Sequence, residues 1–160
     1  MSFPIDRASY RDYPAEWKGS VFVCDIDRTY LATRLSSYKG MMRVPFEAAV
    51  DKIAIDGMRP LLREIRRGPR SRSRHTPLYF VSASPAQLRP VIERKMLFDG
   101  LEFDGTTFKD WLGVVRSGRL GRFREQVGFK LTALLTARRE LPAGAGEKVA
   151  RELHGEEARV

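Results

Sequence analysis

The sequence predicts an α/β fold with a parallel sheet, on three observations. Two short apolar runs, 20–24 and 78–81, have the composition of buried strands. Helical patterns follow these runs, and strands that alternate with helices are typical of a parallel sheet. The chain has 160 residues, enough for one domain with a real core. We divide it into an irregular lead-in over residues 1–20, a domain over residues 21–142, and a polar, disordered tail over residues 143–160.

The front of the domain is expected to contain a strand, a flap and a short helix. Residues 20–24 form the strand, which leads directly into Asp-Ile-Asp-Arg-Thr. Residues 30–57 are mixed in composition and predict a flap with a short helical insertion. Apolar residues at helical spacing predict a helix over residues 60–67, which Gly68 and Pro69 end.

A second strand and a longer helix are expected next. The strand over residues 78–81 ends at Ser82. Ser84 and Pro85 are typical of a helix N-cap followed by proline at the first helical position, and Pro90 is expected to kink that helix. The residues expected to face inward are Leu88, Val91, Ile92 and Met96.

The last part of the domain is expected to hold a weak third strand within residues 105–111 and an amphipathic helix over residues 129–141. After Leu141 and Pro142 no apolar β-branched run follows, so we expect no further strand. The residues of the helix expected to face inward are Phe129, Leu131, Leu134 and Leu135.

The net charge of +9 favours anionic partners such as phosphates, nucleic acid or acidic lipid surfaces, although a solvated basic surface is an equal alternative. The densest region, 59–74, holds seven arginines and one acid, and we expect it to be an exposed surface that contacts anionic lipid headgroups. Nucleic acid is not favoured, because no stacking aromatics are interleaved with the arginines. His75 and His154 are too few and too isolated for a cysteine–histidine metal site.

Nothing in the sequence predicts a membrane span or a secretory signal. No apolar stretch approaches the roughly 18 residues that a span needs, and the first residues lack a basic-then-apolar layout. The chain has one cysteine, Cys24, so no internal disulfide is expected. We therefore expect a cytoplasmic protein.

The central chemical signal is Asp-x-Asp-x-Thr directly after the first buried strand. Ligands bind at the carboxyl ends of parallel strands, so Asp25 is placed to attack a phosphorus atom and form an aspartyl-phosphate. Asp27, two residues on, can protonate the leaving oxygen and then activate water. Two carboxylates that face a phosphate imply a cation, and we expect Mg²⁺ at Asp25 and Asp27. Thr29 is expected to stabilise the turn. The alternative is a strand-end turn with solvated acids.

Two further residues are candidates for the same site. Ser82 ends a strand, and its hydroxyl can hold a phosphoryl oxygen. Lys130 lies at the start of the amphipathic helix, and its charge can offset phosphate and carboxylate charge. Taken alone, Ser82 is better interpreted as an ordinary turn serine and Lys130 as an ordinary surface lysine.

The order of Asp25 and Asp27, then Ser82, then Lys130 resembles the first three motifs of the haloacid dehalogenase superfamily. The segments VCDIDRTYLAT, YFVSASPAQLRPVI, FKDW and FKLTALL with RRELP resemble the catalytic domain of App1-type phosphatidate phosphatases over residues 21–142. This resemblance implies a Rossmann-like core and Mg²⁺-dependent hydrolysis of a phosphomonoester. It also implies a lipid phosphate, such as phosphatidate, as the substrate.

The sequence departs from this family at two places. Arg28 stands where the family often has an acidic residue, at a position that is not catalytic. The fourth strand and its acidic Gly-Asp-Asp or Gly-Asp-Ser motif, which helps bind Mg²⁺, are not found after Pro142, so we expect a sheet that is incomplete at the C-terminal end. The strand that carries Asp25 would then be an edge strand, and this chain alone would be a marginal fold and a poor enzyme.

Three readings remain open from the sequence. The first is a phosphatase that acts through an aspartyl-phosphate; the second is a truncated or non-catalytic relic of the same family; the third is a basic protein that binds anionic surfaces. If the chain is active as written, an acid near the end must supply the missing metal ligand. The candidates are Glu147, Glu152, Glu156 and Glu157.

Overall fold

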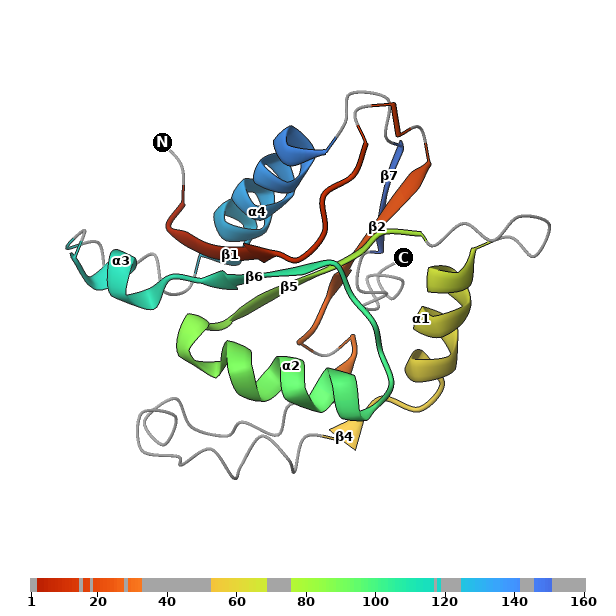
Figure 1. The fold of residues 1–160 in the computed structure, drawn as a ribbon. Coiled ribbons are helices and arrows are strands. Elements are labelled where there is room, and N and C mark those ends of the chain that lie inside the picture. The colour runs from red at the N-terminus through yellow and green to blue at the C-terminus, as the bar shows by residue number, and fades with distance from the viewer. Residues whose placement is uncertain are drawn as a thin grey trace, which may run out of the picture.

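The computed structural model describes residues 3–14, 16–17, 19–27, 29–32, 53–68, 76–116, 118, 125–141 and 146–150. Their core is a five-stranded sheet in the order β1-β6-β5-β2-β7 (Figure 1). β2 (Ser20–Asp25), β5 (Leu78–Pro85) and β6 (Gly105–Lys109) are parallel neighbours. Their carboxyl ends therefore meet at one edge of the sheet, which we call the carboxyl edge. The predicted α/β fold with a parallel sheet is confirmed.

Helices cover both faces of the sheet (Figure 1). α1 (Met58–Arg67) and α2 (Arg89–Phe98) pack on one face, where Leu62, Ile92 and Met96 join a buried cluster with alternate strand residues. α3 (Trp111–Arg116) and α4 (Gln126–Glu140) contribute Val114 and Phe129 to a second cluster on the other face. Because side chains alternate along a strand, β2 and β5 each contribute to both clusters, and this fixes their register in the sheet.

The N-terminal lead-in is not irregular throughout, which corrects our expectation for residues 1–20. β1 (Ile5–Ser9) pairs antiparallel with β6, with Ile5 opposite Lys109 and Ser9 opposite Gly105. The strand lies at an edge of the sheet, so it is only partly buried and tolerates the charges of Asp6 and Arg7.

The expectation that no strand follows Leu141 is also wrong. β7 (Gly146–Ala150) pairs parallel with β2, from Ser20 opposite Gly146 to Cys24 opposite Ala150. β2 therefore lies between two strands, and it is not the exposed edge that we expected. β7 takes the edge position itself, where charged residues such as Glu147 and Lys148 are tolerated.

α2 begins later than the serine–proline signal predicts. β5 extends to Pro85, a 3-10 turn follows over Ala86–Leu88, and α2 starts at Arg89. Pro90 therefore lies in the first turn, where the missing N–H costs no helical hydrogen bond, and it does not kink the helix. Ile92 and Met96 are buried as predicted.

α4 packs through a different face than its leucines suggest. Phe129, Ala133 and Ala137, which lie four residues apart, are buried. Leu131 and Leu135 are 54% and 51% exposed, so the prediction that they face inward is wrong. The two small alanines allow the helix backbone to lie close to the sheet, and this contact decides which face is buried.

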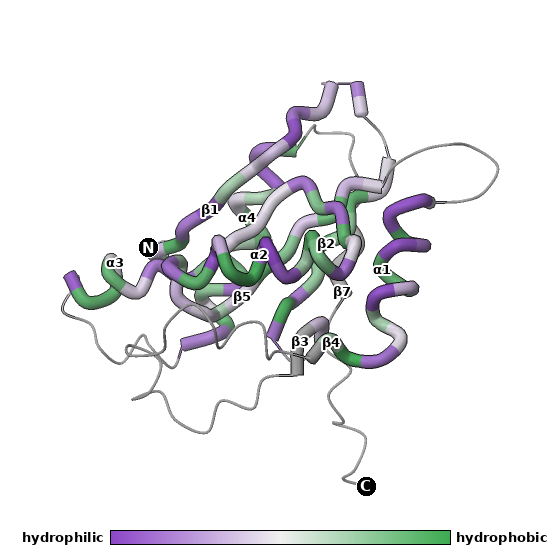
Figure 2. Tube along the Cα trace, turned by 60° about the horizontal axis from the view of Figure 1, so that its bottom comes forward, coloured by the Kyte–Doolittle hydropathy of each residue, from purple (hydrophilic) through white to green (hydrophobic). Residues whose placement is uncertain are grey.

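The arginine-rich region around α1 is only partly the exposed surface we expected. Most of α1 is hydrophilic (Figure 2), and the side chain of Arg67 is 71% exposed. Arg66, however, is 7% exposed and pairs with the buried carboxylate of Asp104 through both of its terminal nitrogens. Residues 69–75 lie outside the described residues, and so does most of the predicted flap over residues 30–57.

Two short strands mark the base of that predicted flap. β3 (Leu31–Ala32) pairs antiparallel with β4 (Ile53–Ala54) in a separate two-stranded sheet. The helical insertion predicted between them lies outside the described residues. No described helix is long and apolar enough to cross a membrane.

Candidate active site

The carboxyl end of β2 presents two carboxylates. Asp25 is the last residue of the strand and is 9% exposed, and Asp27 follows the buried Ile26. The Ile26 amide donates to the carbonyl of Val81 at 2.9 Å, and this bond ties the turn to β5. The turn therefore leaves the sheet with a fixed backbone, so both acidic side chains start from the carboxyl edge.

Lys130 reaches this edge from α4. Its Nζ lies 3.3 Å from Oδ2 of Asp25, and the Lys130 side chain is 34% exposed. The neighbouring residue Phe129 is fully buried and anchors the helix against the sheet. The buried amine of Lys109, at the end of β6, donates to the carbonyl of Glu125 at 3.3 Å and holds the start of α4 at the same edge.

Two serines of β5 hold the carboxylate of Asp27. The hydroxyl of Ser82, which is fully buried, donates to Oδ2 at 2.8 Å. The hydroxyl of Ser84 donates to Oδ1 at 3.3 Å, and the amide of Ser84 donates to Oγ of Ser82 at 3.1 Å. Both carboxylate oxygens of Asp27 therefore accept a hydrogen bond from β5. The Ser82 hydroxyl, which we expected to hold a phosphoryl oxygen, donates to Asp27 in this structure.

Our sequence reasoning missed Ser84, because it read that residue as a helix N-cap. The signal that could have identified it is its spacing of two from Ser82, since alternate residues of an extended chain lie on the same side. β5 is irregular here: Ser82 pairs with Phe108, but Pro85 pairs with the very next residue, Lys109. Ala83 and Ser84 thus form a bulge, a feature that re-aims side chains.

The structure brings all four predicted residues, Asp25, Asp27, Ser82 and Lys130, to the carboxyl edge. The predicted role of Thr29 differs, because its hydroxyl is buried without a hydrogen-bond partner among the described residues. The next residue anchors the turn in its place: the buried hydroxyl of Tyr30 donates to Asp99 at the end of α2.

The neighbouring thiol of Cys24 is not suited to act as the nucleophile. Burial, followed by the charge of Asp25, raises the pKa of the Cys24 thiol to about 12. The thiol is 1% exposed and stays protonated at neutral pH, and a protonated thiol is a poor nucleophile. The carboxylate of Asp25 is the better candidate at this strand end.

A divalent ion at this edge would need ligands beyond the acids that lie there. The described residues contain no group of three or more histidine, cysteine, aspartate or glutamate side chains that could hold a metal ion. Mg²⁺ commonly takes one or two carboxylates and completes its shell with water and phosphate oxygens. The carboxylate of Asp25 meets that minimum, whereas both carboxylate oxygens of Asp27 accept hydrogen bonds from the serines of β5.

Of the four glutamates considered as a further ligand, one lies in the described part of the chain. Glu147 is in β7 opposite Val21, four residues before Asp25 along β2. Four residues of strand span about 13 Å, so Glu147 lies far from the carboxyl edge. Glu152, Glu156 and Glu157 lie outside the described residues.

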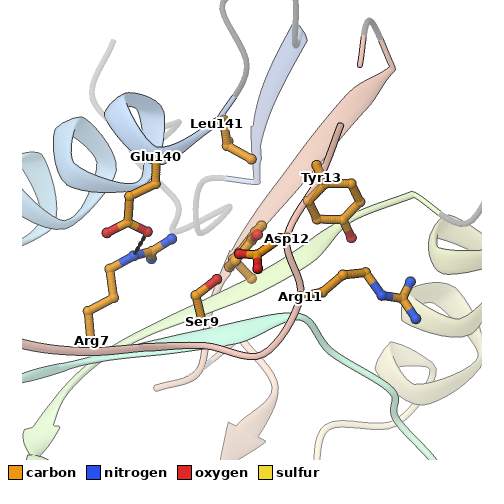
Figure 3. Close-up of a pocket in the computed structure, with 8 residues that line it drawn as sticks. Arg7, Ser9, Arg11, Asp12, Tyr13, Glu140 and Leu141 are labelled. Carbon is orange, nitrogen blue, oxygen red and sulfur yellow. Dashed lines mark hydrogen bonds and ion pairs between the residues drawn. The ribbon is translucent and has the colours of Figure 1, made fainter. Parts of the chain in front are cut away.

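A separate cavity of about 460 Å³ lies between β1, its following segment and the end of α4 (Figure 3). Arg7 and Glu140 form an ion pair there at 2.5 Å, which connects β1 to α4. None of the four predicted site residues lines it, so the cavity is distinct from the cluster around Asp25. The residues that line it are Arg7, Ser9, Arg11, Asp12, Tyr13, Tyr79, Glu140 and Leu141.

Comparisons with curated proteins and with solved structures give few matches. A search of curated proteins found no match. Two solved structures match at 14% identity: one described as the Pnkp1/Rnl/Hen1 complex (TM-score 0.42, 88% of this chain and 49% of that one) and one as the Pnkp1/Rnl/Hen1 RNA repair complex (TM-score 0.44, 90% and 46%). This chain thus spans about half the length of those chains.

The model of one protein family matches most of the chain. The family is described as phosphatidate phosphatase APP1, catalytic domain, and its model matches residues 20–142. The matched range contains Asp25, Asp27, Ser82 and Lys130. The chain therefore belongs to the family of the phosphatidate phosphatase APP1 catalytic domain.

Proposed function

We propose that this chain is a Mg²⁺-dependent phosphomonoester hydrolase of the phosphatidate phosphatase type that acts through an aspartyl-phosphate. The observation that carries the proposal is the cluster at the carboxyl edge. There the carboxylate of Asp25 lies 3.3 Å from the Lys130 amine, and the serines of β5 hold Asp27 beside it. Membership in a phosphatase family supports this assignment and suggests a divalent metal ion.

In the first half of the reaction, a carboxylate oxygen of Asp25 attacks the phosphorus atom. The bond between phosphorus and the alcohol oxygen breaks, and Asp27 in its protonated form donates a proton to that oxygen. Lys130 offsets the negative charge of the phosphoryl oxygens as they approach Asp25. The products of this half-reaction are the free alcohol and a phosphoryl group bound to Asp25.

In the second half, Asp27 acts as a base. It takes a proton from water, whose oxygen attacks the same phosphorus atom, and Asp25 leaves as a free carboxylate. Inorganic phosphate forms, and the proton on Asp27 restores the starting state. Ser82 and Ser84 hold the Asp27 carboxylate in one orientation for both proton transfers.

Asp25 and Asp27 would hold the magnesium ion, with the side chain of Asp25 and the backbone carbonyl of Asp27 as donors. When bound, Mg²⁺ would supply positive charge that stabilises the phosphoryl group during its transfer. Lys130 supplies a second positive charge from α4. With the metal ion bound, these two positive charges would offset the negative charges of Asp25, Asp27 and the phosphate.

We further propose that the substrate is a lipid phosphate, which the family description supports. An exposed basic surface would favour an anionic membrane, and Arg59 and Arg67 on α1 are 52% and 71% exposed. The proposal therefore includes peripheral contact with anionic lipid.

The proposal is tested by purifying the full chain and measuring phosphate release with saturating Mg²⁺. The substrates are a generic aryl phosphate and phosphatidate in mixed micelles. We expect turnover of both that stops when the metal is chelated, and a loss of at least about 10³-fold in Asp25→Asn. Turnover that survives in Asp25→Asn would overturn the mechanism. Turnover of the aryl phosphate without phosphatidate would overturn only the lipid substrate.

A further inference from the structure

The bulge in β5 contains the backbone carbonyl of Ala83, which accepts a hydrogen bond from a side chain outside the sheet. Ala83 lies between the two serines that hold Asp27, at the point where β5 and β6 lose register. The indole Nε1–H of Trp111 donates to this carbonyl at 3.2 Å. A side chain on α3 therefore bonds directly to the backbone of the bulge.

Trp111 is itself held firmly. It opens α3 directly after β6, where Lys109 pairs with both Pro85 and Ile5. The carboxylate of Asp110 accepts a hydrogen bond from the Gly113 amide at 2.9 Å, as a capping residue does. Val114, three residues after Trp111, is fully buried in the core. The indole donor is thus fixed to both the sheet and the core.

We propose that Trp111 is a positioning residue for the phosphatase reaction. Its indole N–H fixes the carbonyl of Ala83, and so it fixes the two serine hydroxyls that orient the Asp27 carboxylate. This inference rests on the proposed function, in which Asp27 is the acid and base. The chain of contacts runs from Trp111 to Ala83, then to Ser82 and Ser84, and then to Asp27.

Trp111 can have this effect because the backbone of a bulge has fewer ladder hydrogen bonds than a regular strand and is therefore less constrained. Without the indole bond, the carbonyl of Ala83 loses a donor, and the segment between Ser82 and Pro85 can relax. A displacement of about 1 Å in a catalytic group costs on the order of 10²-fold in rate. The loss should appear in turnover and not in substrate binding, because the chain of contacts from Trp111 ends at Asp27, whose proposed role is proton transfer.

The sharpest test replaces Trp111 with 3-benzothienylalanine, which keeps the shape of the indole but has sulfur in place of N–H. The matched control is the same replacement at Trp17, whose indole nitrogen is buried without a hydrogen-bond partner among the described residues. We expect kcat to fall about 10-fold at position 111 with KM unchanged, and no change at position 17. The melting temperature of each variant is expected to stay within about 2 °C of the wild type.

A double variant distinguishes a positioning role of Trp111 from a role in packing alone. If Trp111 acts through the serines, its replacement should add little to the loss caused by Ser84→Ala, because both changes release the same carboxylate. Losses that multiply in the double variant would overturn the proposal. A wild-type kcat in the position-111 variant, or an equal loss at position 17, would overturn it as well.

A readout without turnover distinguishes this inference from the proposed function. The Asp27 side-chain carbon and the Ser82 and Ser84 amides can be observed by NMR in labelled protein. We expect these signals to move in the position-111 variant and to stay in place in the position-17 variant. Unchanged signals would overturn the positioning role. Absence of phosphatase turnover in the wild type would overturn the proposed function alone.

Discussion

At the scale of single residues, the proposed proton transfers depend on the two hydrogen bonds that hold the carboxylate oxygens of Asp27. The Ser82 hydroxyl lies 2.8 Å from one oxygen and the Ser84 hydroxyl 3.3 Å from the other. We expect Ser82→Ala to lower kcat by about 10- to 100-fold and Ser84→Ala by less, because the longer bond is the weaker one. Steady-state kinetics on the two variants checks this order. A larger loss in Ser84→Ala would contradict it.

A second residue-scale prediction concerns Asp99, which holds Tyr30 behind the turn. Burial raises the pKa of Asp99, but hydrogen bonds from Lys95 and Tyr30 outweigh burial and hold this pKa below its ordinary value. A carboxyl whose pKa is lower in the folded state stabilises the fold above its unfolded pKa of about 4, and this contribution is lost as the pH falls through the folded pKa.

The variant Asp99→Asn tests whether the stabilisation by Asp99 is lost as the pH falls. We expect the variant to unfold about 2 kcal/mol more easily at pH 7, a gap that stays constant to about pH 5 and narrows toward pH 3. Chemical denaturation at each pH measures the gap. A gap that does not change over this range would show that Asp99 acts by packing and not by charge.

Single residues were predictable where a buried strand ends. Asp25, Asp27 and Ser82 each follow an apolar run, and the common edge of parallel strands brings them together. Trp111 was not predictable as a donor, because its partner is a backbone carbonyl in the bulge of β5, and the sequence does not indicate that bulge. The exposed Leu131 was misjudged because leucine and alanine compete for the buried face of α4, and close packing against the sheet favours alanine.

Among the strands and helices, β7 is the one whose presence differs most from the expectation, because it covers the edge of β2. It pairs with β2 over its whole length, so the Asp25 strand has a neighbour on both sides. We expect Val149→Pro to destabilise the protein by about 3 kcal/mol, because proline removes a backbone donor and fixes the chain angle.

Val149→Thr is the matched control, since threonine keeps the N–H and the β-branch. Hydrogen exchange of the β2 amides should accelerate in Val149→Pro and stay slow in Val149→Thr. Equal protection in the two variants would mean that β2 does not depend on β7.

The arginine-rich helix α1 combines two kinds of arginine. Arg66 pairs with Asp104 in the core, and removal of one partner of a buried pair leaves an uncompensated charge. We expect Arg66→Ala to cost about 3–5 kcal/mol of unfolding free energy. Arg67→Ala should change it by less than about 0.5 kcal/mol, because the Arg67–Glu64 pair is exposed. Equal costs in denaturant unfolding would contradict this division.

The edge strands show where sequence reasoning is weak. β2 and β5 are buried on both faces and therefore appear as apolar runs, which we predicted. β1 and β7 lie at the two edges, carry charged residues and are stabilised by backbone pairing with a neighbour. Their sequences carry little hydrophobic signal, so a strand there depends on the partner that the fold places beside it.

At the scale of the whole molecule, a parallel sheet between two helical layers brings distant parts of the chain to one edge. β2, β5 and α4 supply Asp25, Asp27, Ser82 and Lys130, and β6 with α3 supplies Trp111 behind them. The central claim is that this edge transfers a phosphoryl group to Asp25. Every other proposal about the site depends on that step.

The most direct measurement is to trap the aspartyl-phosphate. The full chain is mixed with a phosphomonoester and Mg²⁺, quenched in acid and treated with borohydride, which reduces an acyl phosphate to an alcohol. Peptide mass spectrometry should then find homoserine at position 25, and should not find it when Mg²⁺ is omitted. Measured turnover with an unmodified Asp25, or with the modification at another acidic residue, would contradict the account.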